Sequence, residues 1–193
     1  MIKHVRMIIL FFVTIMVATL TTAKANPSPK TNQCFPDLTQ SNISEATLLV
    51  WSNEAAVAAF TYNFVNYKTQ LQTVSNYFTP NGWKEFYKAL EQSNNLDAVK
   101  AKKLLVTAAA IRAPIITQAG VLDGRYSWRV EIPLKVTFQN NFEYAQQSVK
   151  VAVLIARATP YEGVRGLVIL QFVVNPLPQE EDSSNSQKPE PFN

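Results

Sequence analysis

The chain has 193 residues, of which 47% are hydrophobic, and it carries a formal net charge of +4. That length fits one packed domain with tails. The only histidine is His4 and the only cysteine is Cys34. A single cysteine excludes a disulfide within the chain, and this composition predicts no metal and no cofactor of the zinc or haem type.

Residues 1–25 have the pattern of a secretory signal peptide. A short basic start is followed by an uncharged apolar run, residues 7–20, and by an Ala-x-Ala pattern at Ala23 and Ala25. We predict cleavage after Ala25 and a mature chain in the periplasm. The alternative is an uncleaved anchor at the periplasmic face of the inner membrane, although a membrane span needs roughly 20 apolar residues.

Removal of this segment changes the charge of the chain. Three basic residues leave with it, so 15 basic and 14 acidic residues remain and the net charge falls to +1. A nearly neutral chain gives no electrostatic reason to bind nucleic acid. We therefore expect protein partners, no nucleic acid, and membrane contact only if the signal is uncleaved.

Residues 26–43 are polar, contain prolines and have no periodicity, so we expect a flexible arm. Cys34 lies in this arm. In an oxidising compartment it either remains a free thiol or forms an intermolecular disulfide between two chains.

Helical periodicity predicts a first helix over residues 44–67, with Ser44 as its N-cap. Its apolar residues form two nearly opposite stripes, one of which contains Trp51. The second stripe consists of Val57, Phe60, Phe64 and Tyr67. A helix that is apolar on two sides is buried on two sides, so the second stripe packs within the domain or forms an interface with a partner.

A second helix is predicted to begin after Thr79, a good N-cap, with Pro80 in its first turn. It is expected to end near residues 93–95, and residues 96–101 can add one more helical turn. The basic cluster of Lys100, Lys102 and Lys103 follows. It is either a solvated surface or a docking patch.

From Lys103 onward the apolar residues repeat with a period of two, which predicts strands. Residues 126–138 form the longest, and residues 149–155 and 167–174 form two more. Pro133 cannot donate a ladder hydrogen bond, which predicts an edge position or a bulge. Residues 175–193 contain four prolines and four acidic residues, so we expect a disordered tail.

Asp123 and Gly124 are a strong signal for a two-residue hairpin turn before the longest strand. The turn predicts three pairs across the hairpin: Leu122 with Arg125, Val121 with Tyr126, and Ala119 with Trp128. This register places apolar residues opposite apolar residues.

Helices followed by antiparallel strands predict an α+β domain over residues 44–174. We expect N-terminal helices packed on one face of a curved antiparallel sheet of four to five strands. Trp51, Trp83 and Trp128 are expected in the core rather than at an interface.

No catalytic motif is present in the sequence, and we expect no enzyme. Asp123 belongs to the turn, Glu131 lies on the wet face of its strand, and Glu54 lies in a polar seam of the first helix. A catalytic carboxylate usually lies in an apolar pocket that raises its pKa. A rival hypothesis is a periplasmic binder of a small ligand, whose cone would hold a cavity above about 300 Å³.

Four segments resemble the DotI/IcmL family of type IVB secretion systems. They are residues 51–67 (WSNEAAVAAFTYNFVNY), 77–83 (YFTPNGW), 94–104 (NNLDAVKAKKL) and 120–128 (GVLDGRYSW). The resemblance covers residues 48–174. It implies a nuclear-transport-factor-like cone, similar to the periplasmic domains of conjugative type IV secretion assembly factors.

The resemblance also implies a function. Family members are scaffolds that self-associate at the inner membrane in a machine that exports effector proteins or conjugative DNA, and they offer no catalytic residues. They typically have a cytoplasmic segment and a full membrane span before the periplasmic domain, whereas here six residues precede a short apolar run. Two interpretations follow: a periplasmic paralogue, or a shortened core component with an uncleaved anchor.

Overall fold

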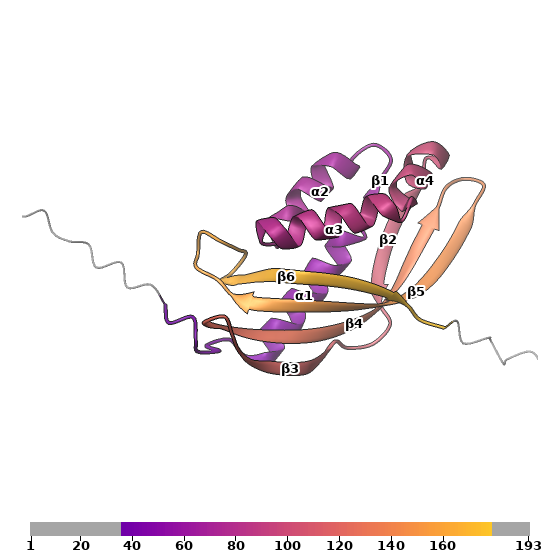
Figure 1. Ribbon diagram of the computed structural model, residues 1–193. Helices are drawn as coiled ribbons and strands as arrows, with labels where there is room; N and C mark the ends of the chain where they lie inside the picture. The colour runs from indigo at the N-terminus through magenta and orange to yellow at the C-terminus, as the bar shows by residue number, and fades with distance from the viewer. Residues whose placement is uncertain (1–35, 179–193) are drawn as a thin grey trace, which may run out of the picture. The chain divides into compact units, whose positions relative to one another are not determined.

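The computed structural model describes residues 36–178. The helices are α1 (Glu45–Ala59), α2 (Tyr67–Ser75), α3 (Pro80–Gln92) and α4 (Asn95–Lys102). The strands are β1 (Tyr62–Asn63), β2 (Leu105–Ala110), β3 (Ile115–Leu122), β4 (Arg125–Gln139), β5 (Tyr144–Arg157) and β6 (Leu167–Pro176). Helices therefore precede the main strands, and the predicted α+β class is confirmed (Figure 1).

Several predicted features lie outside the described residues. They are the signal peptide with Ala23 and Ala25, the cysteine Cys34, and most of the tail. The part of the predicted arm that is described, residues 36–43, contains no helix or strand. Its carbonyl at Leu38 accepts a hydrogen bond from the Tyr126 amide at 2.7 Å, which attaches this segment to the start of β4.

All the strands pair antiparallel in one sheet, in the order β1-β2-β4-β5-β6, with β3 also paired to β4. β2 and β3 pair with different halves of β4, while β5 pairs with most of its length. The sheet thus has six strands rather than the four to five expected. The difference arises because β2 and β3 share one edge of β4 and β1 adds a two-residue strand.

The predicted hairpin between β3 and β4 is confirmed in detail. Asp123 and Gly124 have φ angles of 49° and 77°, the positive values that this turn requires. The three predicted pairs across the turn, from Leu122 with Arg125 to Ala119 with Trp128, are the observed ones.

The prediction for Pro133 holds in part: the residue lies inside the central strand β4, but β4 has no ladder partner on one side at this position. The Ile111 amide donates to the Pro133 carbonyl at 2.9 Å. In a strand the N–H and C=O of one residue point to the same side. The missing N–H of Pro133 therefore points to the gap between Ala110, where β2 ends, and Ile115, where β3 begins. No strand lies there to require that donor.

The first helix is shorter than predicted. It begins at the expected cap, where the Thr47 amide donates to Ser44 Oγ at 3.2 Å, but it ends at Ala59 rather than near residue 67. The side-chain oxygen of Asn63 accepts from the amides of Val65 and Asn66, at 2.8 and 2.9 Å. Asparagine competes with the helical backbone in this way and stabilises a turn instead.

The core lies between the helices and the inner face of the sheet. Val130, Ile132 and Leu134 of β4 are fully buried, and Trp128 is 4% exposed. Trp51 of α1 is 1% exposed, and its Nε1 donates to the Val164 carbonyl at 3.0 Å. This hydrogen bond satisfies the indole N–H and joins α1 to the connection between β5 and β6.

The helix predicted to begin after Thr79 is α3, and it begins as predicted. Pro80 occupies the first turn of α3, and the Gly82 amide donates to the Thr79 side chain at 3.1 Å. The Thr79 amide donates to the Ile169 carbonyl at 2.9 Å, so the start of α3 lies against β6. A Cβ added at Gly82 would lie 2.7 Å from the Leu170 carbonyl oxygen. Only glycine allows this close approach without a shift.

The last strand extends two residues beyond its predicted end. Asn175 and Pro176, assigned to the tail from the sequence, pair with Lys150 and Val149 of β5. The Leu177 amide then donates to the Ser148 carbonyl at 2.9 Å. β5 is long enough to provide partners for these residues despite the proline.

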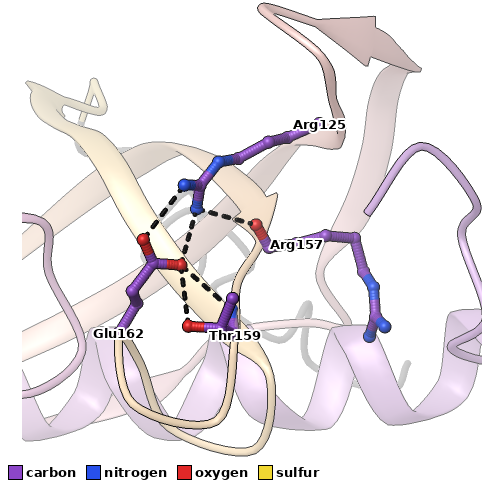
Figure 2. A network of polar contacts seen from close by, with 4 residues as sticks. All are labelled: Arg125, Arg157, Thr159 and Glu162. Atoms are coloured by element: carbon purple, nitrogen blue, oxygen red, sulfur yellow. Dashed lines mark hydrogen bonds and ion pairs between the residues drawn. The ribbon is translucent and has the colours of Figure 1, made fainter. Parts of the chain in front are cut away.

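A polar network holds the β5–β6 connection against the hairpin turn (Figure 2). Both guanidinium Nη atoms of Arg125 contact the Glu162 carboxylate at 3.0 Å. The amide and hydroxyl of Thr159 also donate to this carboxylate, each at 3.0 Å. These donors, above all Arg125, lower the pKa of Glu162 from 4.5 to about 2. The Arg157 carbonyl accepts a further bond from Arg125, while the Arg157 side chain points away (Figure 2).

The close packing at Gly82 generates a stability prediction. Gly82→Ala forces α3 away from β6, and we expect it to lower the free energy of unfolding by about 1–3 kcal/mol. Asn81→Ala, on the exposed side of the same turn, is the matched control and should change stability by less than about 0.5 kcal/mol. Urea unfolding measures both, and equal midpoints would contradict the packing argument.

The network at Glu162 predicts a pH dependence of stability. A folded-state pKa of about 2 against an ordinary 4.5 means that the unfolded chain binds the proton more tightly. The stabilisation is therefore complete above pH 4.5 and is lost as the pH falls towards 2. Wild type should lose more stability than Glu162→Gln across this window in urea titrations. Glu85→Gln should follow wild type, and parallel curves for wild type and Glu162→Gln would contradict the prediction.

Candidate functional site

The carboxylates considered from the sequence are all in structural positions. Glu54 pairs with Arg165, as expected for an exposed seam. Glu131 lies 3.3 Å from Lys150 on the neighbouring strand, and Asp123 forms the hairpin turn. The structure does not combine them into one pocket, since each lies on a different element. None of these residues is placed for acid–base chemistry.

Metal binding and membrane crossing have no candidate between residues 36 and 178. Within that range no group of three or more His, Cys, Asp or Glu residues is arranged to hold a metal ion. None of the helices there combines the length and hydropathy that a membrane span requires.

The predicted interface residues Val57, Phe60, Phe64 and Tyr67 do not form one helical stripe, because α1 ends before three of them. Phe60 is the C-cap of α1 and lies near Phe172, with ring centroids 6.2 Å apart. Phe64 lies in the turn after β1 and is 40% exposed. Tyr67 begins α2, with the ammonium of Lys100 6.0 Å from its ring centroid. Phe60, Phe64 and Tyr67 line three separate depressions.

An apolar groove of about 440 Å³ opens between the end of α1, α3 and the sheet. Phe60, Phe86, Phe138 and Phe172 are among the residues that line it. The many large aromatic residues on the inward faces predict a filled cone from the sequence. That expectation is wrong at this end, where the groove has a volume within the range of ligand pockets. Ser93, Asn95 and Gln147 supply polar atoms, and no charged side chain lines the groove. Such a lining can bind an apolar group but offers no acid or base.

Two of the three lysines in the basic cluster at the end of α4 form ion pairs with different acidic residues. Lys100 pairs with Asp97 at 2.5 Å, and Lys102 pairs with Glu143 at 2.9 Å. The hydrogen bond that Lys100 donates to the Asp97 carboxylate raises the pKa of Lys100. Lys103 has a φ of 54° and ends the helix. Two of the three charges are thus neutralised locally, as expected for a solvated surface.

Sequence reasoning missed an exposed apolar patch beside this cluster, at the end of the sheet that holds the β4–β5 turn. It consists of Phe64, Val65, Leu105, Phe142 and Tyr144, with Phe142 95% exposed. All of these residues except Tyr144 line a shallow depression of about 550 Å³. The signal available in the sequence was a phenylalanine directly after two turn-forming asparagines.

A second exposed apolar series follows the β2–β3 segment. Ile111, Ile115, Val121 and Leu122 are between 43% and 58% exposed. The sequence predicted the register of this strand correctly but gave no sign that one of its edges is uncovered. Both apolar series lie on the surface and provide contacts that a binding protein can use.

Comparison with known proteins places the chain among secretion components. Residues 11–176 match a family model described as a type IVb secretion system, inner-membrane complex component. No curated protein matches the chain.

Solved structures give the same result. The periplasmic domain of DotI is 57% identical, with a TM-score of 0.68, over 72% of this chain and 100% of that one. An IcmL-like type IV secretion system protein from Legionella pneumophila is 31% identical, with a TM-score of 0.65, over 70% and 94%. A periplasmic fragment of TraM is 24% identical, with a TM-score of 0.64, over 69% and 98%, and it supports the fold alone.

These matches confirm the resemblance seen in the four sequence segments and the predicted secretion role. Because the family model matches most of its length, the chain belongs to the DotI/IcmL family and is a component of type IVb secretion systems.

Proposed function

We propose that this chain is a non-catalytic scaffold in the periplasm that holds neighbouring secretion subunits, or further copies of itself, through its exposed apolar surfaces. The main support is the 57% identity with the periplasmic domain of DotI, which extends over the whole of that domain. The two apolar series, around Phe142 and along β3, provide surface for such contacts.

The absence of catalysis is supported by how the carboxylates are used. Glu54 and Glu131 are ion-paired, and Glu162 is held by Arg125. Burial raises the pKa of Tyr62 to about 12, which keeps its phenol protonated at neutral pH. Glu54, Glu131 and Glu162 are therefore engaged in structural contacts within the described residues.

Two arrangements put residues 36–178 in the periplasm. In one, cleavage after Ala25 releases the domain, and in the other the apolar run of residues 7–20 stays as an anchor. The family match begins at residue 11, inside that run, and the family is described as part of an inner-membrane complex. Both observations support the anchored arrangement.

A small-ligand binder remains a weaker candidate. The groove of about 440 Å³ has the required volume, and its lining is mainly apolar. Binding of an apolar compound there is compatible with a scaffold, and the family relationship favours the secretion role.

The scaffold proposal predicts co-isolation with secretion subunits. A C-terminally tagged copy, purified from gently solubilised envelopes of its native host, should bring inner-membrane secretion subunits with it. Mass spectrometry of the intact chain shows at the same time whether Met1 or Asn26 is the first residue. A soluble chain that begins at Asn26 and brings no secretion subunit would contradict the proposal.

A further inference from the structure

β3 is an edge strand whose outer side has no partner among residues 36–178. Its residues pair with β4 on one side, from Ile115 with Glu131 to Leu122 with Arg125. Figure 1 shows β3 at the outer edge of the sheet, away from α2 and α3. A row of unpaired backbone groups at a sheet edge is a template for another strand.

The backbone groups that point outward can be identified from one hydrogen bond. The Tyr126 amide donates to the Leu38 carbonyl, so it points away from β3. Val121, which lies opposite Tyr126, is therefore in a non-hydrogen-bonded pair, and its own N–H and C=O point to the free edge. Ala119, two residues away on the same regular stretch, points the same way.

The usual protection of an edge is largely missing here. Residues 115–122 contain no charged residue and no proline. A register shift between Ile116 and Gln118 limits the regular stretch to residues 118–122, whose centre is Gly120. Val121 and Leu122 are 58% and 43% exposed on this stretch. Apolar side chains beside unpaired amides favour association rather than oppose it.

At the other edge of the sheet, the start of β6 is hydrogen-bonded to the segment that leads into α3. The Ile169 amide donates to the Tyr77 carbonyl at 2.7 Å, and the Thr79 amide returns a bond to the Ile169 carbonyl at 2.9 Å. The chain thus covers the start of β6 with its own backbone. At this position the β6 edge is bonded to the chain's own backbone, whereas β3 has no such partner among residues 36–178.

We propose that the free edge of β3 pairs antiparallel with β3 of a second copy, so that the two sheets join across a two-fold axis at Gly120. This proposal rests on the proposed scaffold function. An isologous interface places a strand opposite itself, and the neutral residues 118–122 bring no like charges together.

The register follows from the outward-pointing groups. With the axis at Gly120, Ala119 exchanges both hydrogen bonds with Val121 of the second copy, and the symmetry repeats the exchange. Gly120 then faces its own counterpart, and a Cβ added there meets nothing within 4 Å. The contact is small, so we expect a weak dimer that forms mainly where copies are concentrated.

Cysteine cross-linking of the full chain in a Cys34→Ser background tests this register. In Gly120→Cys the two Cα atoms should lie about 4.5 Å apart, which suits a disulfide. Mild oxidation should therefore give a covalent dimer. In Gln118→Cys, on the same face, the two cysteines should lie roughly 13 Å apart and give little or none. Val173→Cys, on β6, should give none either.

A second variant guards against a cross-link that forms by chance. Val121→Lys places a charge at the edge and should abolish the dimer in sedimentation, with unchanged urea unfolding, whereas Val65→Lys should leave the dimer intact. Equal cross-linking at positions 118 and 120, none at 120, or a link from 120 to a different protein would overturn the proposal. If secretion subunits still co-isolate in those cases, the scaffold function stands, whereas loss of co-isolation in wild type would overturn the function itself.

Discussion

Backbone pairing along β4 determines the position of nearly every other element. This 15-residue strand pairs with β2 and β3 on one side and with β5 on the other, and its inner side chains form the centre of the core. Strict alternation of side chains fixes its register, because a shift by one residue would bring every apolar side chain of β4 to the solvent. Pro133 fits in the middle of the strand only because its missing donor points to the gap between β2 and β3. The helices are then placed by this inner face, with Trp51 bonded to the β5–β6 connection.

The same arrangement leaves the two edges of the sheet unequal. The segment that leads into α3 covers the start of β6, and Gly82 allows the helix to approach it closely. β3, the second half of a long broken strand, has no equivalent cover between residues 36 and 178. The proposed scaffold role depends on surfaces of this kind rather than on a pocket. The carboxylates are accordingly used in ion pairs that hold loops, as Glu162 does with Arg125.

Features set by local chemistry were predictable from the sequence. The Thr79 cap, the turn at Asp123 and Gly124, and the register from Ala119 to Trp128 each depend on a few adjacent residues, and each was correct. Features set by distant contacts were not. The sequence predicts a first helix that continues past Ala59, because Phe60, Phe64 and Tyr67 continue its apolar period. In the structure the helix ends at Ala59, and the following residues form the Asn63 turn and pair with β2. The exposure of the β3 edge was not predictable from the sequence for the same reason, because it depends on which distant elements cover the strand.

The claim that β3 is an open, self-complementary edge is tested most directly by hydrogen exchange on the whole purified chain. The amides of Ala119 and Val121 should exchange rapidly in dilute solution, when each copy is alone, and should become protected as the concentration rises. The amides of Gly120 and Leu122, which bond to β4 in this register, should stay protected throughout. Rapid exchange of Ala119 and Val121 at every concentration would contradict pairing between copies. Protection that persists on dilution would show that the chain covers this edge itself.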